Sequence, residues 1–326
     1  MHEIKDLVAC YVTDAGFLFP SIASAMSLRA KAGKHDCDVV IFAIGIAPDQ
    51  ILRLRDSLSS FRIDLIELES DLGIIDKSKW NGTHVPLATV GRFFVAEVLK
   101  HRYRRILYID GDTMFARDPS ELFHFDPGPG RIGAVEDIRS FARDDIFGAT
   151  GKYTREYFKN IGVQKGQGYF NAGVFIVRSE DWVDMSRQCL EYLVKNTEIC
   201  RFHDQSAMNA VLGKDGRSFL SLRWNFQTPY NLLWLYGKID PALVHFTEAN
   251  KPWLGAMRPW CDWHERYRAV ELAVAGLQRP QAWPDAQVAA ANRHYAERVF
   301  RQSAMFAHRL PGRWARIRHY EAECLI

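Results

Sequence analysis

The chain has 326 residues, of which 48% are apolar and 25% charged, and its formal net charge is +3. This length and composition are those of an ordinary folded protein, with room for one large α/β domain and a smaller appendage. So small a charge gives no reason to expect a nucleic-acid partner, and no apolar run approaches the ~18 residues of a membrane-spanning helix.

The first half of the chain alternates strand-like and helix-like segments. Apolar runs predict strands at 7–12, 38–43, 63–68 and 105–109, and apolar residues at helical spacing predict helices at 22–30, 49–59 and 87–98. This alternation predicts an α/β fold, with a mainly parallel central sheet and helices on both faces.

The second half continues less regularly. We expect strands at 132–135, 173–177, 219–222 and 242–246, and helices at 181–192 and 204–212. Pro280 and Pro284 bracket a short hinge, which predicts a domain at 1–278 followed by a C-terminal extension at 279–326.

The cysteines and the N-terminus indicate the compartment. The first apolar run has an acidic flank and no small-residue cleavage site, so it does not resemble a signal peptide. The cysteines are scattered and form no CxxC pair: Cys10, Cys37, Cys189, Cys200, Cys261 and Cys324. We therefore expect a cytoplasmic protein with reduced, mostly buried thiols and no zinc site built on them.

Acidic residues follow two of the predicted strands. Asp14 comes after the first strand, and Asp110 and Asp112, separated by Gly111, come after the fourth. Ligands of such sheets bind beyond the carboxyl ends of the strands. Two carboxylates on either side of one small residue can point at a single Mg²⁺ or Mn²⁺, which typically bridges a diphosphate. A polar Asp-Gly turn is the alternative interpretation.

His245 and Lys251 could complete such a site. A transferase that releases a diphosphate must neutralise it, which a metal ion and nearby cations can do. His245 could be a third metal ligand and Lys251 could bind a phosphate. A single histidine at the end of a strand is otherwise more often a hydrogen-bonded surface residue.

Several short motifs follow one another from about residue 7 to residue 264. They are Tyr11-Val12-Thr13-Asp14, His84 with Arg92, Leu107-Tyr108-Ile109-Asp110-Gly111-Asp112, Glu136-Asp137, Phe170-Asn171-Ala172-Gly173-Val174, His203-Asp204-Gln205, Trp224-Asn225-Phe226, and His245 with Lys251-Pro252-Trp253. In this order they resemble the motifs of the family 8 glycosyltransferases, which include glycogenin and bacterial lipopolysaccharide galactosyl- and glucosyltransferases. The resemblance implies the Rossmann-like GT-A fold, a UDP-sugar donor, Mn²⁺ or Mg²⁺ as cofactor, and retention of the anomeric configuration.

The resemblance also implies roles for individual residues. The metal ligands would be Asp110, Asp112 and His245. The nucleotide and its phosphates would contact Val12, Thr13, Asp14, His84, Val85, Gly111 and Lys251, with Asp14 accepting a hydrogen bond from uracil. The donor sugar would contact Arg92, Asp110, Asn171, Ala172, Asp204 and Gln205. The catalytic residues would be Gln205, Asp204 and Asp137.

Residue chemistry alone leaves other interpretations open at several of these positions. Asp14 could be an ordinary loop aspartate, Arg92 an exposed arginine on a helix, and Asp204 a charge favoured by a helix start. Asp137 could simply lie in a loop, and the segment 170–174 could be a turn that enters a buried strand.

The expected mechanism depends on Gln205. A retaining double displacement needs a carboxylate nucleophile beneath the anomeric carbon, and an amide is a poor nucleophile. We therefore favour a front-face mechanism in which the leaving diphosphate helps to deprotonate the acceptor and Gln205 stabilises positive charge at the anomeric centre. A trapped covalent adduct on Asp204 or Asp137 would contradict it.

The chain departs from the family pattern at Glu248. Relatives usually have a glycine there, which lets backbone amides approach the diphosphate, whereas a glutamate adds bulk and negative charge. The side chain could turn outward, or the loop could bind the donor differently.

The C-terminal extension is basic and aromatic, and we expect it to be helical. Its arginines, at 293, 298, 301, 309, 313, 316 and 318, are interleaved with Tyr295, Phe300, Met305, Phe306, Leu310, Trp314 and Ile317. Such a segment could bind the inner face of an anionic membrane as a peripheral contact. The alternative is a basic amphipathic helix folded back on the protein.

The function that the sequence favours is transfer of a hexose, glucose or galactose, from a UDP-sugar to a glycan or glycolipid such as lipopolysaccharide. Three alternatives stay open: a self-glycosylating protein like glycogenin, a non-catalytic sugar-nucleotide-binding protein, and an inverting GT-A enzyme.

Overall fold

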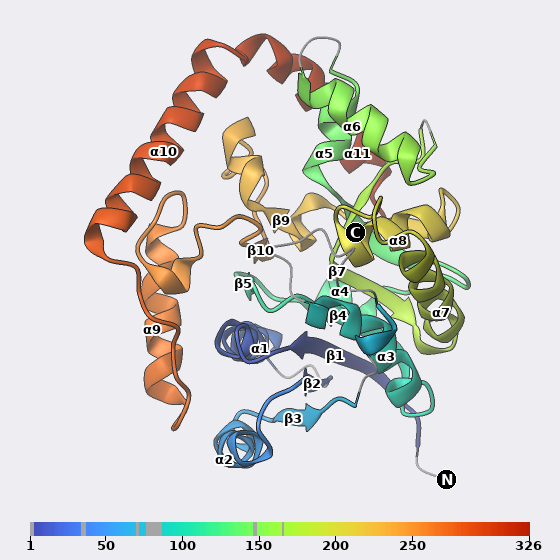
Figure 1. Ribbon diagram of the computed structural model, residues 1–326, viewed down its shortest axis with the longest axis vertical. Helices are drawn as coiled ribbons and strands as arrows, with labels where there is room; N and C mark the ends of the chain where they lie inside the picture. The colour runs from blue at the N-terminus through green and yellow to red at the C-terminus, as the bar shows by residue number, and fades with distance from the viewer. Residues whose placement is uncertain (1–2, 34–36, 70–71, 76–86, 146–148, 165) are drawn as a thin grey trace.

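The computed structural model describes residues 3–33, 37–69, 72–75, 87–145, 149–164 and 166–326. A seven-stranded sheet with the order β3-β2-β1-β4-β7-β6-β8 forms its centre (Figure 1). The strands are β1 (Lys5–Thr13), β2 (Asp38–Ala43), β3 (Ile63–Glu67), β4 (Tyr103–Ile109), β6 (Ile132–Glu136), β7 (Phe170–Arg178) and β8 (Arg217–Phe219).

Helices cover both faces of this sheet. They are α1 (Leu18–Ala32) and α2 (Pro48–Ser59) on one face, and α3 (Gly91–Leu99), α7 (Ser179–Lys195) and α8 (His203–Leu212) on the other. Alternate residues of β1 belong to separate hydrophobic cores, because successive side chains of a strand point to opposite faces. A strand buried on both sides reads as a continuous apolar run, which is why the sequence predicted it. The predicted α/β fold class is confirmed.

The direction of the strands is mixed at one position. β3, β2, β1 and β4 are parallel, but β7 runs antiparallel to both β4 and β6.

The strand predicted at 219–222 is shifted toward the N-terminus. β8 ends at Phe219, and Ser221 accepts a hydrogen bond from the backbone N–H of Arg223 at the start of a 3₁₀ turn.

A second, three-stranded sheet was not predicted as a unit. It contains β5 (Thr113–Phe115), β10 (Leu243–His245) and β9 (Phe226–Gln227), in the order β5-β10-β9. β10 pairs antiparallel with β5, with His245 opposite Thr113. This pairing joins two segments far apart in the sequence at the end of β4.

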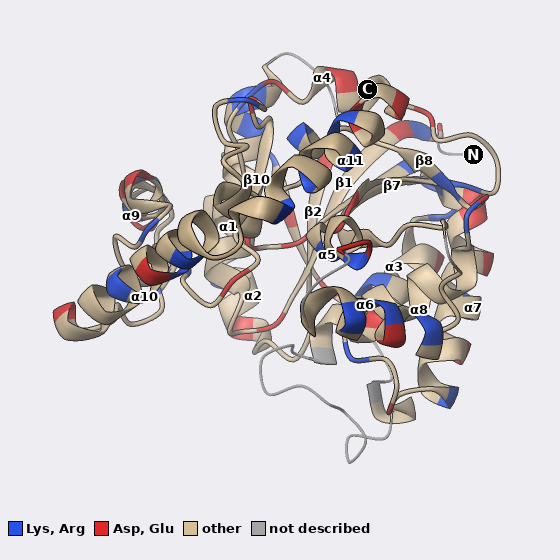
Figure 2. Ribbon diagram, turned by 90° about the horizontal axis from the view of Figure 1, so that it is seen from above, with Lys and Arg blue, Asp and Glu red and all other residues tan. Residues whose placement is uncertain are grey.

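The remaining helices lie around this layered core, with α9 packed on α1, and in the C-terminal extension. They are α4 (Ser120–His124), α5 (Ile138–Arg143), α6 (Ala149–Asn160), α9 (His264–Ala273), α10 (Asp285–Ala304) and α11 (Leu310–Glu323). Figure 1 shows α10 arching from the α9 side of the molecule to the side of α5, α6 and α11. Basic and acidic bands both occur along α10 in Figure 2. None of the helices described has the length and apolar character that crossing a bilayer requires.

The extension is therefore helical, as expected, and its two helices differ in environment. α11 packs against the main core through Leu310, Ile317 and Tyr320, and its arginines Arg313 and Arg316 both bind Asp145. On α10, by contrast, Phe300 is 68% exposed. The alternative interpretation, a basic amphipathic helix that folds back on the protein, thus describes α11. The proposed independence of residues 1–278 stays a prediction.

All six cysteines have free thiols, and four of them are buried. Burial raises the pKa of the Cys200 thiol to about 12, so this group stays protonated and unreactive at neutral pH. The expectation of mostly buried thiols is confirmed.

Candidate functional site

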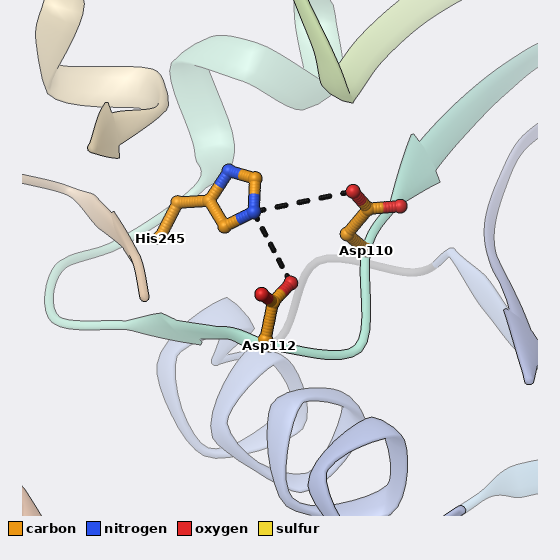
Figure 3. Close-up of side chains that lie close together, drawn as sticks. All are labelled: Asp110, Asp112 and His245. Atoms are coloured by element: carbon orange, nitrogen blue, oxygen red, sulfur yellow. Dashed lines mark hydrogen bonds and ion pairs between the residues drawn. The ribbon is translucent and has the colours of Figure 1, made fainter. Parts of the chain in front are cut away.

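Asp110, Asp112 and His245 meet where the two sheets join. β4 ends at Ile109, and the Asp110-Gly111-Asp112 turn leads directly into β5. Because His245 lies opposite Thr113 in the β5–β10 pair, its ring lies beside the turn. Figure 3 shows both carboxylates and the imidazole directed toward one another.

The distances fit a site for one divalent cation. His245 Nε2 lies 3.1 Å from Asp112 Oδ1 and 3.9 Å from Asp110 Oδ2. One ligand atom from each residue falls within 4.8 Å of the others. A Cβ at Gly173, on β7, would lie 2.3 Å from His245 Cε1 and 2.7 Å from Asp110 Oδ2, so only glycine leaves this space open. Two carboxylates and an imidazole are a donor set suited to Mn²⁺ or Mg²⁺.

Asn225 orients the His245 ring. Its Oδ1 lies 2.8 Å from His245 Nδ1, and its Nδ2 donates to Asn171 Oδ1 at 2.9 Å. Since Asn225 presents an oxygen, His245 Nδ1 donates to it, which leaves Nε2 as the ring nitrogen that faces the carboxylates and would bind a metal. Such partners fix the tautomer and direction of a ligating histidine.

We expect Asn225→Ala to weaken Mn²⁺ binding by roughly 10- to 100-fold, because the imidazole loses its orienting partner. Calorimetric titration with Mn²⁺ measures this directly. Asn231→Ala is the matched control, since the Asn231 side chain donates to the Thr228 carbonyl and not to Asp110, Asp112 or His245. Equal affinity of the Asn225 variant and the wild type would rule out this role.

Lys251 adds positive charge next to Asp110, Asp112 and His245. Its Nζ lies 2.7 Å from Asp112 Oδ2 and also donates to the carbonyl of Phe246. Burial alone would raise the pKa of the Asp112 carboxyl, but Lys251 and His245 together hold that pKa well below its usual range. Asp112 is therefore ionised, as a metal ligand must be.

A cleft of about 720 Å³ opens beside these residues. Its lining combines the end of β1, the Asp110–Asp112 turn and the segment after β10: Val12, Thr13, Asp14, Gly16, Phe17, Ala88, Thr89, Tyr108, Asp110, Gly111, Asp112, Thr247, Glu248, Ala249, Lys251, Trp253, Leu254 and Pro280. Every described residue predicted to contact the nucleotide or its phosphates is in this lining. His84 and Val85 lie outside the described residues.

Two of these lining residues have evident structural roles. Asp14 Oδ1 accepts hydrogen bonds from the backbone N–H groups of Gly16 and Phe17, which shape the entry into α1. A Cβ on Gly111 would lie 2.1 Å from Ser21 Oγ on α1, so packing alone requires glycine there. Contact of either residue with a nucleotide stays a prediction.

Arg92 is not an exposed helix arginine: it is 2% exposed. Its guanidinium donates to the carbonyls of Thr89 and Ala172 and to Asp110 Oδ1 at 2.9 Å, and it lies 3.1 Å from Asp204 Oδ2. The bond to Asp110 helps to hold that carboxylate in place, and Arg92 itself is not among the residues that line the cleft. Contact of Arg92 with the sugar stays a prediction.

Asp204 is a buried carboxyl that shares one guanidinium with Asp110. Burial raises the pKa of Asp204 to about 6; the Arg92 charge opposes this shift and the Asp110 charge adds to it. The carboxyl thus binds its proton more tightly in the folded than in the unfolded chain. Protonated Asp204 therefore favours the folded chain relative to ionised Asp204. This contribution to the free energy of unfolding is complete below the unfolded pKa of about 3.8 and is lost as the pH rises through about 6.

We therefore expect Asp204→Asn to gain stability relative to the wild type as the pH is raised from about 4 to about 7.5. The gain in the free energy of unfolding should be roughly 3 kcal/mol across this window. Urea unfolding at several pH values measures it, with the exposed Asp215→Asn as control. A difference between variant and wild type that does not change with pH would contradict the assignment.

Asp137, Asn171 and Gln205 form a hydrogen-bonded group at the ends of β6 and β7 and the start of α8. Gln205 Nε2 donates to Asp137 Oδ2 at 3.2 Å, and Gln205 Oε1 accepts from the backbone N–H of Ala172 at 3.1 Å. Asp137 is fully buried and is also bound by Arg139 through both carboxylate oxygens. The structure thus gathers the residues predicted to act on the sugar, while Asp204 faces Arg92.

Sequence reasoning assigned no role to Asn225, Gly173 or Arg139. Asn225 and Gly173 belong to motifs that resemble the family's. Their roles, however, follow from the contact of Asn225 with His245 and from the closeness of Gly173 to His245 and Asp110, which the sequence does not reveal. Arg139 lies only two residues from Asp137, and its pairing with that carboxylate had no signal in the sequence.

Comparison with known proteins places the fold and the family. The galactosyltransferase LgtC, in its crystal structure with donor and acceptor sugar analogues, superposes with a TM-score of 0.65 at 19% identity, over 84% of this chain and 97% of LgtC. This similarity identifies the GT-A fold.

Similar sequences occur in bacteria. General stress protein A of Bacillus subtilis is 27% identical over 272 residues, which are 77% of this chain and 88% of that protein. The lipopolysaccharide 1,2-glucosyltransferase of Escherichia coli is 25% identical over 174 residues, or 50% of this chain and 48% of the enzyme. The sequence model described as glycosyl transferase family 8 matches residues 8–256, which is most of the chain. The chain therefore belongs to glycosyl transferase family 8.

Proposed function

We propose that the protein is a retaining hexosyltransferase that uses a UDP-sugar, requires Mn²⁺ or Mg²⁺, and acts on a glycan or glycolipid acceptor. The observation that carries this proposal is the meeting of Asp110, Asp112 and His245 at the edge of a cleft of about 720 Å³ that Lys251 also lines. Cleft and charge together suit a nucleoside diphosphate bound through a divalent cation.

The donor would lie with its uridine near Val12, Thr13 and Asp14 and its diphosphate near Asp112 and Lys251. Asp110, Asp112 and His245 would hold the cation, which, when bound, stabilises the negative charge that develops on the leaving diphosphate. The Lys251 ammonium would bind a phosphate oxygen and add to that stabilisation.

The sugar would lie between this site and the group formed by Asp137, Asn171 and Gln205. Gln205 Oε1, fixed by the backbone N–H of Ala172, offers a partial negative charge to the anomeric carbon. Asn171 joins the two halves of the site, since it is bound both to Gln205 and, through Asn225, to His245.

The transfer itself breaks one bond and forms another at the anomeric carbon. The bond from that carbon to the β-phosphate oxygen breaks and its electron pair leaves with UDP, while the acceptor hydroxyl oxygen bonds to the carbon on the same face. The hydroxyl proton passes to a phosphate oxygen of the departing UDP. No protein nucleophile is required in this front-face mechanism.

The donor sugar and the acceptor class are proposed from two similar proteins. The Escherichia coli enzyme is a lipopolysaccharide glucosyltransferase and LgtC is a galactosyltransferase, so we propose glucose or galactose as the donor sugar. The acceptor of the Escherichia coli enzyme, lipopolysaccharide, suggests a glycolipid acceptor. The exposed Phe300 and Met305, at the C-terminal end of α10, could contact a membrane that carries such a glycolipid.

Incubation of the protein and a lipopolysaccharide acceptor with UDP-glucose, UDP-galactose and GDP-mannose, in turn, tests the proposal. We expect Mn²⁺-dependent release of UDP from one of the two UDP-hexoses and an α-configured product by NMR. A β-configured product would replace retention by inversion. A mass ladder on the protein itself would indicate self-glycosylation, and UDP binding without turnover would indicate a non-catalytic protein.

A further inference from the structure

One face of α10 packs on the segment that follows the metal site. Val288, Asn292, Tyr295 and Arg298 are spaced three or four residues apart and so share one face of the helix. A Cβ on Gly255 would lie 2.8 Å from Val288 Cγ2, which shows how closely the two segments approach. Asn292 Oδ1 accepts the backbone N–H of Arg258 at 2.7 Å, and Tyr295 is buried.

Arg298, at the end of this face, binds Glu248 through two hydrogen bonds. Its Nη1 and Nη2 lie 2.7 and 2.6 Å from the two carboxylate oxygens. The side chains are 28% and 22% exposed, so the pair is mostly shielded from water. Such bidentate pairs fix geometry as well as charge. Arg298 lies beyond residues 8–256, which the family model matches.

Glu248 lines the same cleft as Asp110, Asp112 and Lys251. A carboxylate at this position would repel a nucleoside diphosphate, whose own charge is negative. The guanidinium of Arg298 cancels that charge and ties the 246–251 segment, including Lys251, to α10. This pairing accounts for a glutamate at a position where a small, neutral residue would serve the donor better.

We propose that Arg298 is a positioning residue for the donor: by pairing with Glu248 it makes the cleft compatible with a nucleoside diphosphate. The inference rests on the proposed function, because it assumes that the donor's diphosphate occupies this cleft. It assigns to the C-terminal extension a role in donor binding rather than only a surface role.

Calorimetric titration with UDP in the presence of Mn²⁺ tests the inference. We expect Arg298→Ala to raise the Kd for UDP roughly tenfold, because Glu248 is left unpaired beside the diphosphate. The double variant Arg298→Ala/Glu248→Gln should return to within about twofold of the wild type, since the repelling charge is gone. In turnover assays the single variant should raise the donor KM and leave kcat at saturating donor nearly unchanged.

The matched control is Arg301→Ala, on the same helix, whose arginine is 59% exposed and pairs only weakly with Glu297 at 3.8 Å. It should bind UDP like the wild type. A wild type that fails to bind UDP would overturn the proposed function and this inference together. If the wild type binds UDP, either an unchanged Kd for Arg298→Ala or a double variant as weak as the single one would overturn this inference alone.

Discussion

Asp112→Ala should reduce transfer by roughly 1,000-fold or more, because the variant loses a proposed metal ligand that would face the leaving diphosphate. Asp112 is held at once by His245 and Lys251, so its removal also leaves two basic groups without their shared anion. Asp110→Ala should have an effect of similar size. UDP release at saturating Mn²⁺ and UDP-sugar measures both variants.

The fold should survive these substitutions, because the Asp110–Asp112 turn follows the carboxyl end of β4 and neither side chain is part of a hydrophobic core. Circular dichroism and thermal melting check this. Asp49→Ala, at an exposed position on α2, is the control. Full activity in either the Asp110 or the Asp112 variant would mean that the metal site has been misplaced.

Deleting α11 by truncation after Arg309 should abolish cooperative folding. The deletion uncovers the core contacts of Leu310, Ile317 and Tyr320 and leaves the buried Asp145 without Arg313 and Arg316. Together these losses amount to roughly 5 kcal/mol or more, which is comparable to the whole stability of a typical domain, about 5–15 kcal/mol. Thermal melting of the truncated chain tests the expectation.

A point variant separates the packing of α11 from the loss of a whole segment. The Tyr320 hydroxyl accepts the backbone N–H of Glu136 and donates to the carbonyl of Leu220. Tyr320→Phe should cost about 1–3 kcal/mol because both buried groups lose their partner, whereas the exposed His319→Ala should be neutral. A truncated chain that melts like the wild type would instead show that residues 1–309 fold without α11.

The central sheet was predictable because its first four strands are apolar runs, nearly continuous in β1, β2 and β4 and alternating with exposed acidic residues in β3, and a helical pattern separates each from the next. Of the small sheet, only the strand expected at 242–246 was predicted, and it corresponds to β10. β5 and β9 have only three and two residues and carry no periodicity, so neither they nor their pairing with β10 could be predicted. The antiparallel direction of β7 also leaves no mark on its own residues.

The metal pair was predictable because Asp110 and Asp112 follow an apolar strand. That His245 joins them depends on the β5–β10 register, a contact between distant segments that local patterns do not contain. Local patterns also fail for Arg92. Its surroundings in the sequence suggest an exposed helix position, yet Arg92 is buried and its charge is paired with two carboxylates from different elements, Asp110 and Asp204. Likewise the basic pattern of α10 suggested a membrane face, and it did not reveal that Arg298 pairs with Glu248.

The most direct test of the account is the melting temperature of the wild type and of Asp112→Ala with UDP, UDP-glucose, UDP-galactose and GDP-mannose, each with and without Mn²⁺. A ligand that binds only the folded state must raise that temperature. We predict a rise with UDP and at least one UDP-hexose that requires Mn²⁺ and disappears in Asp112→Ala. No rise with any nucleotide, or an equal rise without Mn²⁺, would contradict a metal-held diphosphate at Asp110, Asp112 and His245.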